Sequence, residues 1–280
     1  GRLYQADKNE LKDESFYINT QKDSQGNNKY QPLQPYYLIK PKQLDQLACF
    51  KNIYNYYNGV LRQTFGIDLI SQVQILTAQH AGLLGTKCLN ATIQSIIQGT
   101  THFTEQLNKI LAMNKYSSDY VEEHKLLNIK EEFYVGDKVC WTQNNYQLNP
   151  PLMNGTMGII TNILHNASDK GQDIYIMEFN IEGQAHTYHI EKGTLEAEQF
   201  MLAYALTVHK YQGKEIPIAM VICHKAQSFS HSRNWLYTAM TRARKSLILL
   251  GDSWAIDNAI GKLEVNQRKT LTRYIVSKLC

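Results

Sequence analysis

A short apolar segment, a glycine turn and an amphipathic helix follow one another in this chain, and this order restricts its fold more than any other feature. Val73–Leu76 is the apolar segment, Gly82 and Gly85 mark the turn, and leucine and isoleucine recur at helical spacing from Leu89 to Ile97. Strand, turn and helix in this order are typical of α/β domains, in which helices pack against a sheet. The sequence therefore predicts an α/β fold.

The same pattern returns near the end of the chain. Apolar runs predict strands at 202–206, 218–222 and 246–250, and residues 235–242 have the spacing of a helix. We expect these strands to extend the same sheet.

The first third of the chain contains further elements. Apolar side chains recur at helical spacing from Pro41 to Phe65, and Gly66 then provides a stop. The polar stretch Gln21–Gln31 contains turn residues and predicts a hairpin or two edge strands, formed with residues 16–18 and 36–39.

Between these α/β regions the pattern changes to short strands separated by asparagine, glycine and aspartate. Such strands are predicted at 135–139, 158–160, 174–177 and 186–190. Short strands with this spacing are typical of a small antiparallel barrel. We therefore expect three parts, which are the first part of the α/β domain at 1–130, an inserted small β-barrel at 131–195 and the remainder of the α/β domain at 196–280.

Composition excludes several classes of protein. With 43% hydrophobic and 19% charged residues the chain can bury an ordinary core, and no apolar stretch approaches the roughly 20 residues of a membrane span. Its five cysteines are scattered without a C-x-x-C pair, which argues against disulfides and zinc and favours the reducing cytoplasm. The net charge of +4 permits a polyanionic partner but does not require one.

The segment Thr207–Glu215 follows directly on an apolar strand and is rich in polar groups. Ligands of α/β sheets bind at the carboxyl ends of strands, so this turn is a candidate site. Thr207, His209 and Lys210 carry groups that donate hydrogen bonds to phosphate, and Gly213 lets a backbone N–H approach an anion. The alternative is an ordinary turn, but so many polar side chains in nine positions serve no packing purpose.

A second polar segment, Tyr237–Arg244, precedes the last predicted strand. On a helix, Thr238, Arg242 and Lys245 share one side and Arg244 points elsewhere. An arginine that faces the domain or a partner can stabilise a transferring phosphoryl group, with a roughly thousandfold effect on turnover. The alternative is a solvated helix end whose cations offset the helix dipole.

Together the two segments resemble motifs V and VI of superfamily 1 DNA helicases of the RecD type. This group includes the alpha subunit of exodeoxyribonuclease V and conjugative relaxase-helicases. The matching forms are T-x-H-K-x-Q-G-x-E at 207–215 and Y-T-A-x-T-R-A-R at 237–244, and weaker similarities lie at 75–85 (motif IV) and 133–158 (the start of an inserted barrel). The resemblance covers residues from about 70 to 255. It implies a RecA-like second motor domain of the P-loop NTPase type with an inserted Src-homology-like barrel.

The resemblance implies contacts with single-stranded DNA. In the family, the positions of Thr207, His209 and Lys210 lie on or near the backbone of the strand. Aromatic side chains also stack on bases in single-strand binders, at about 1–3 kcal/mol per base. Trp141 and Tyr146 are therefore further candidates, although most of the 18 tyrosines must be structural.

The resemblance also implies one side of an ATP site. Gln212, Gly213 and Glu215 face the nucleotide, with the carboxylate near the ribose, and Arg242 points at the γ-phosphate across the cleft between motor domains. Relatives usually carry an arginine in motif IV where this chain has His80, so the resemblance provides no second phosphate contact there.

The chain lacks the parts that hold a triphosphate. No G-x-x-x-x-G-K-[S/T] loop occurs, and no apolar strand ends in Asp-Glu for magnesium. In the family these parts belong to a first motor domain, which we expect before Gly1 because the chain begins without methionine. ATP and Mg²⁺ are therefore expected as cofactors of the full-length protein, and we expect the chain alone to bind neither tightly and to be inactive.

Two further pairs of residues do not support a site. His186 and His189 have the spacing of metal ligands, but on a strand they point to opposite faces, so no metal is expected. Cys223 beside His224 could be a nucleophile with its base, yet adjacent strand residues also diverge. Cys223 ends an apolar run, where a small buried side chain fits, so we expect it to lie in the core.

The sequence thus predicts the C-terminal motor part of a cytoplasmic ATP-dependent DNA helicase, for which the resemblance implies 5′ to 3′ movement. Its expected partners are single-stranded DNA, the N-terminal motor domain of the same parent chain and other exonuclease subunits. Two alternatives remain, a nucleic-acid-binding module of the same fold that drives nothing and the helicase part of a conjugative relaxase. The sequence before Gly1 would distinguish them.

Overall fold

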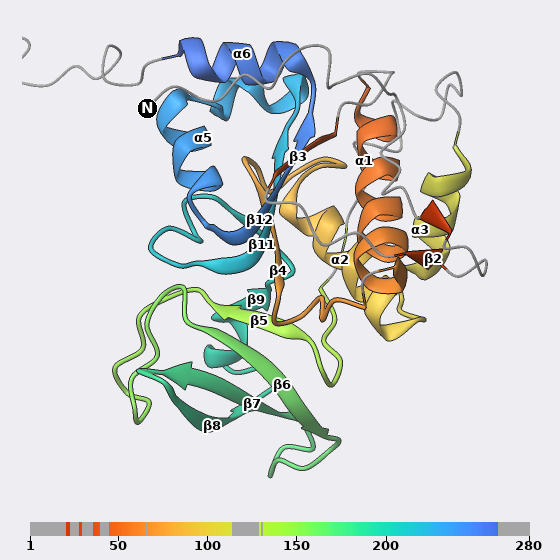
Figure 1. Cartoon of the computed structure of the whole chain (residues 1–280). Coiled ribbons are helices and arrows are strands. Elements are labelled where there is room, and N and C mark those ends of the chain that lie inside the picture. The colour runs from red at the N-terminus through yellow and green to blue at the C-terminus, as the bar shows by residue number, and fades with distance from the viewer. Residues whose placement is uncertain are drawn as a thin grey trace, which may run out of the picture.

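The computed structural model describes residues 21–22, 28–29, 36–39, 45–64, 66–113, 129 and 131–262. Within these residues the chain forms a parallel sheet covered by helices and, below it in Figure 1, an antiparallel sheet. None of the helices in these ranges is long and apolar enough to span a bilayer. The predicted α/β fold is confirmed.

The main sheet has five parallel strands in the order β10, β4, β11, β12 and β3. Their bounds are β3 Tyr36–Ile39, β4 Val73–Thr77, β10 Ala205–Thr207, β11 Ile216–Cys223 and β12 Ala243–Gly251. The inner strand β4 is buried along its whole length, as expected of a strand covered on both faces. Because all five strands run in one direction, their carboxyl ends share one edge of the sheet, where ligands of α/β domains bind.

Helices cover both faces of this sheet (Figure 1). One face carries α1 Gln46–Asn55 with its π-helical continuation η1 Tyr56–Thr64, α2 Thr86–Gln98 and α3 Thr104–Ala112. The other face carries α5 Arg233–Met240 and α6 Ser253–Gly261. In β11, Met220 packs in the first core and its neighbour Val221 in the second, because successive strand side chains point to opposite faces.

The second sheet is antiparallel, in the order β8, β7, β6, β5 and β9. Its strands are β5 Lys138–Trp141, β6 Met157–Leu164, β7 Ile174–Ile181, β8 Gln184–Glu191 and β9 Phe200–Leu202, with a 3₁₀ turn, η2, at Glu196–Glu198. Phe179, Phe200 and Trp141 lie in its own apolar core. The antiparallel strands predicted between the two α/β regions are therefore present.

The predicted small barrel is not confirmed, because the second sheet is open within the described residues. Closing it would require its edge strands β8 and β9 to pair, and they do not. The short β9 pairs only with β5, and two residues later the chain enters β10 of the main sheet. The single strand predicted at 202–206 is thus divided at Ala203 and Tyr204, where the backbone passes from one sheet to the other.

A buried carboxylate joins the two sheets. Asp137, just before β5, accepts hydrogen bonds from Gln94 of α2 (2.6 Å), from the Tyr204 hydroxyl (2.9 Å) and from the Tyr134 N–H (2.7 Å). Burial raises the pKa of the Asp137 carboxyl, and these hydrogen bonds oppose that shift. The second sheet is therefore fixed to α2 and to the β9–β10 connection.

The elements near the start differ in part from expectation. The strands β1 Gln21–Lys22 and β2 Asn28–Lys29 pair antiparallel within the polar stretch itself, not between the flanking residues predicted as strands. Residues 36–39 form β3, which joins the main sheet beside β12 instead of the hairpin. Residues 16–18 lie outside the described part of the chain. The helix predicted at 41–65 begins at Gln46, where Asp45 caps it by accepting from the Ala48 N–H (2.7 Å).

Candidate nucleotide and nucleic-acid site

The strand register places the ends of the Thr207–Glu215 segment at opposite edges of the main sheet. Thr207 ends β10 and is the register partner of Thr77, which ends β4. Glu215 instead precedes Ile216 at the start of β11, which pairs with the start of β12. The segment therefore runs back along the sheet from its carboxyl edge to its amino edge.

Backbone hydrogen bonds fold this segment into compact turns. The Tyr211 N–H donates to the Thr207 carbonyl (3.1 Å), and the Gln212 N–H donates to the His209 carbonyl (3.3 Å). Gly213 has a φ of 82°, which side chains other than glycine rarely adopt. The Tyr211 ring is buried and anchors the turn, whereas His209, Gln212 and Gly213 are exposed. The exposed groups are those that the sequence assigns to ligands.

Lys210 connects this turn with the second sheet. Its ammonium donates to the side-chain oxygen of Asn154 and to the carbonyl of Thr142 (3.3 Å), both in the loop between β5 and β6. An ammonium has three donors and no acceptor, so a phosphate oxygen at this point would share or replace these contacts. No local pattern predicts the pairing with Asn154, which is 56 residues away.

Arg242 lies between the end of α5 and the start of β12, and its guanidinium is held by three hydrogen bonds. Nε donates to the Thr238 carbonyl (2.9 Å), one terminal nitrogen donates to the Lys214 carbonyl (2.9 Å), and the other donates to the Thr241 hydroxyl (3.0 Å). The bond to Lys214 joins the two polar segments at the amino edge of the sheet. The structure thus brings together segments that the sequence only places in order.

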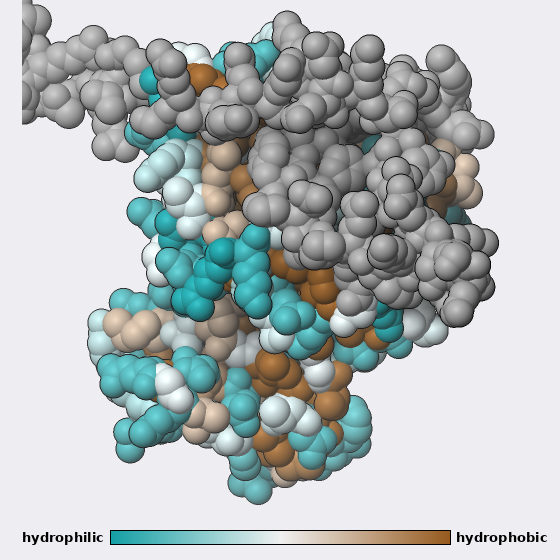
Figure 2. Space-filling model, viewed as in Figure 1, coloured by the Kyte–Doolittle hydropathy of each residue, from teal (hydrophilic) through white to brown (hydrophobic). Residues whose placement is uncertain are grey.

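Arg244 and Glu215 form an ion pair at the same edge. The Arg244 Nε lies 2.7 Å from the Glu215 Oε2, and both side chains are more than half exposed. Burial raises the pKa of the nearby Tyr211 hydroxyl to about 12, against the opposing charges of Arg242 and Arg244. Figure 2 shows hydrophilic side chains over the end of α5 and the start of β12. Helical spacing predicts that Arg244 points away from the Arg242 side, but no local pattern predicts its pairing with Glu215.

The two aromatic candidates for base stacking differ in exposure. Trp141 is fully buried, with its ring 6.0 Å from that of Phe179 and 6.4 Å from that of Phe200. The expectation that it stacks on bases is therefore wrong, because its position in β5 directs it into the core. Tyr146, in the loop after β5, is 70% exposed and remains a candidate.

His80 lies after the end of β4, at the carboxyl edge of the sheet. Its Nδ1 is 2.9 Å from the Thr86 hydroxyl at the start of α2. Gly85 closes this loop, and a side chain there would lie 2.3 Å from the Ala81 carbonyl oxygen. Because Arg242 lies at the amino edge, His80 does not meet it in this structure.

The pairs set aside in the sequence show no site in the structure. His186 and His189 lie three residues apart on β8, so they point to opposite faces. No cluster of three or more histidine, cysteine or acidic side chains able to hold a metal occurs in the described ranges. Cys223 is buried, as predicted, and burial raises the pKa of its thiol to about 12.

The fold defines a class, a doubly wound α/β domain that carries an antiparallel insertion and a cation-rich turn. Residues 202–250 match the family model of the UvrD-like helicase C-terminal domain. The chain is 29% identical over 191 residues to the ATP-dependent RecD2 DNA helicase of Deinococcus radiodurans, which covers 65% of this chain and 20% of that protein. It is 27% identical over 196 residues to the RecBCD enzyme subunit RecD of Buchnera aphidicola, which covers 70% of this chain and 27% of that protein.

Among solved structures, the Pif1 helicase of Candida albicans aligns with a TM-score of 0.42 and 15% identity, over 80% of this chain and 56% of that one. The chain therefore resembles RecD-type helicases and contains a segment of the UvrD-like helicase C-terminal kind, which confirms the similarity predicted from its motifs. It spans about a fifth to just over a quarter of the length of these curated relatives.

Proposed function

We propose that this chain is the RecA-like second motor domain of an ATP-dependent DNA helicase of the RecD type and that it acts in the cytoplasm. The observation that carries the proposal is the hydrogen bond between Arg242 and the Lys214 carbonyl, which joins the two helicase-like segments at one edge of the sheet. The sequence similarity to RecD2 and RecD proteins supports the same assignment. An exonuclease complex as partner is part of the proposal because three relatives bear the name of a RecBCD subunit.

In this proposal Arg242 supplies positive charge to the γ-phosphate of ATP. A guanidinium has five N–H donors, and the three hydrogen bonds of Arg242 use one from each nitrogen. One N–H on each terminal nitrogen is then available for phosphate oxygens. Because the other bonds fix the plane of the guanidinium, little reorganisation precedes its contact with the transition state.

Gln212, Gly213 and Glu215 complete this side of the nucleotide. The Glu215 carboxylate, now paired with Arg244, is the acceptor that we assign to a ribose hydroxyl. Among the described residues that we assign to the nucleotide, Glu215 is the only carboxylate and Arg244 pairs with it, so this set does not fit Mg²⁺. Magnesium and the phosphate cradle therefore belong, in this proposal, to a separate P-loop domain.

The DNA side of the proposal consists of Thr207, His209, Lys210 and Tyr146. Lys210 contacts Asn154 in the β5–β6 loop, and Tyr146 lies in the same loop with most of its surface exposed. Single-stranded DNA bound at Lys210 would therefore also contact the β5–β6 loop of the second sheet. Phosphate contacts of this kind position a strand without selecting its sequence.

Two measurements on the 280-residue chain test the proposal. Fluorescence anisotropy should show binding of single-stranded DNA that weakens with salt, and calorimetry with a non-hydrolysable ATP analogue should give a dissociation constant of about 1 mM or weaker. Micromolar ATP binding, or DNA-stimulated phosphate release by the pure chain, would mean that it contains a complete nucleotide site. If a longer chain that includes a P-loop domain also failed to hydrolyse ATP, the result would favour the alternative, a DNA-binding module without motor activity.

A further inference from the structure

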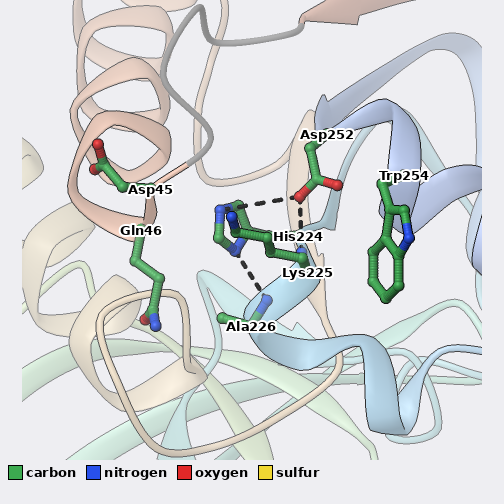
Figure 3. A pocket seen from close by; sticks show the side chains of 7 residues that line it. All are labelled: Asp45, Gln46, His224, Lys225, Ala226, Asp252 and Trp254. Atoms are coloured by element: carbon green, nitrogen blue, oxygen red, sulfur yellow. Dashed lines mark hydrogen bonds and ion pairs between the residues drawn. The ribbon is translucent and has the colours of Figure 1, made fainter.

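A pocket that no sequence motif marks opens at the carboxyl ends of β11 and β12 (Figure 3). It has a volume of about 700 Å³, within the range of small-ligand sites. Its walls come from both faces of the sheet: Asp45 and Gln46 at the start of α1, His224 and Lys225 after β11, and Asp252 and Trp254 at the start of α6. The pocket lies at the carboxyl edge of the sheet, the same edge at which Thr207 ends β10. In the sheet order, β4 separates β10 from β11, and β12 follows β11.

The base of the pocket is rigid, and its buried carboxylate is already engaged. Asp252 is fully buried and accepts from the Lys225 N–H and the Ala255 N–H, each at 2.8 Å. The buried His224 accepts from the Ala226 N–H through Nδ1 (3.1 Å), which leaves the hydrogen on Nε2, 4.0 Å from Asp252. These bonds fix the wall before any ligand arrives.

The groups that face solvent are an aromatic ring, a cation and an amide. Trp254 is 56% exposed, whereas the other two tryptophans, Trp141 and Trp235, are buried. Lys225 is exposed, and its side chain lies between Trp254 and Gln46, which are on opposite sides of the pocket (Figure 3). An exposed indole and an ammonium in the same pocket are the groups with which single-strand binders stack on a base and contact its phosphate.

We propose that this pocket takes one nucleotide of single-stranded DNA, with its base on the Trp254 ring and its phosphate at Lys225. The inference rests on the proposed function and adds a contact to it. Single-stranded DNA is a better occupant than free ATP, because one lysine cannot neutralise the charge of a triphosphate. In a DNA strand, the neighbouring nucleotides make further contacts that hold the bound nucleotide in place. Neighbouring β-strands lie about 4.8 Å apart, and β10 and β12 are three such spacings apart in the sheet order. Their carboxyl ends are therefore about 14 Å apart, a distance that one short oligonucleotide can span.

The fluorescence of Trp254 offers a direct test. Because the other two tryptophans are buried, emission that responds to a ligand on the surface comes mainly from Trp254. Titration of the chain with an oligo-dT of about 15 nucleotides should quench this emission with the same midpoint as anisotropy. Trp254→Ala should weaken binding about tenfold, the loss expected for one base–aromatic stack, and Trp254→Phe should retain most of the affinity.

Matched variants separate the pocket from general surface effects. Phe229 is 89% exposed but lies outside the pocket, so Phe229→Ala should leave strand affinity unchanged. Lys225→Ala should weaken binding and reduce its dependence on salt. Thermal unfolding of each variant checks that it is folded.

The outcomes distinguish this inference from the proposed function. Strand binding that neither quenches the tryptophan nor changes in Trp254→Ala would overturn the pocket and leave the helicase assignment standing. Quenching by dTMP at the same concentration as by oligo-dT would overturn the strand as occupant in favour of a free nucleotide. Failure of the unaltered chain to bind any strand would overturn the DNA contacts of the proposed function and the pocket together.

Discussion

The Arg244 Nε donates to the Glu215 Oε2 across 2.7 Å, although 29 residues separate the two in sequence. The pair lies where the Thr207–Glu215 segment and the start of β12 meet. It occupies the carboxylate that we assign to the ribose of ATP. An exposed ion pair of this kind contributes about 0–1 kcal/mol, so a ribose hydroxyl can displace the arginine at small cost.

Arg244→Ala should therefore leave the fold almost unchanged. We expect the free energy of unfolding to change by less than about 1 kcal/mol, since both side chains are more than half exposed and solvent screens them. Urea unfolding followed by circular dichroism measures this. A loss above about 2 kcal/mol would show that the pair is a structural contact, and Glu215→Gln should match the arginine variant.

Arg242→Ala, in a longer protein that carries the proposed P-loop domain, should lower DNA-stimulated ATP hydrolysis roughly a thousandfold with little effect on the affinity for single-stranded DNA. The reason is that the guanidinium is proposed to meet charge that develops on the γ-phosphate. A phosphate-release assay beside anisotropy measures the two effects. Retention of more than about a tenth of the turnover would contradict the assignment, and Arg242→Lys tests whether charge without the planar fork suffices.

Lys210→Ala should weaken single-strand binding for all sequences and make the dependence of affinity on salt shallower, because it removes a phosphate contact. Asn154→Ala is the matched control, since it removes the partner of Lys210 and keeps the cation. We expect it to preserve the salt slope. Equal slopes for Lys210→Ala and the unaltered chain would show that Lys210 only holds the β5–β6 loop.

Tyr146→Ala and Trp141→Ala should have opposite effects. Trp141 is fully buried, so its removal should lower the free energy of unfolding by about 3–5 kcal/mol. Tyr146 is 70% exposed, and its removal should leave stability unchanged while weakening strand binding. Unfolding and anisotropy measured on both variants check this, and unchanged strand affinity in Tyr146→Ala would remove it from the DNA surface.

Because of the buried His231, we expect the free energy of unfolding to fall at mildly acidic pH. Burial lowers the pKa of its ring from 6.5 to about 4, so below pH 6.5 the unfolded chain takes up a proton that the folded chain does not. The free energy of unfolding should fall by about 3 kcal/mol between pH 6.5 and 4 and level off below that.

The variant His231→Phe isolates this effect from other titrating groups. It keeps an aromatic ring against Trp235, whose ring centroid lies 4.4 Å from that of His231, and removes the titration. The difference in unfolding free energy between the two proteins should therefore vary over pH 4 to 6.5 and be constant above it. A constant difference throughout would contradict the shifted pKa.

The main elements of the fold follow from the sequence because the direction of a side chain depends on local periodicity. Ile218–Ile222 is apolar throughout and was predicted as a strand, and it forms most of the buried β11. The polar segments at 207–215 and 237–244 were likewise recognisable, because a motif is a local pattern of residue types.

Contacts between distant segments required the tertiary structure. The sequence could not show that β8 and β9 do not pair with each other, that Lys210 contacts Asn154, or that Arg244 contacts Glu215. The sequence predicts Trp141 as a candidate for base stacking, whereas the pairing of β5 with β6 and β9 turns its side chain inward. The pocket around Trp254 likewise arises where α1 and α6 approach from opposite faces of the sheet. Local periodicity thus determined which segments are strands and helices, whereas burial and pairing across the sheets decided which side chains meet.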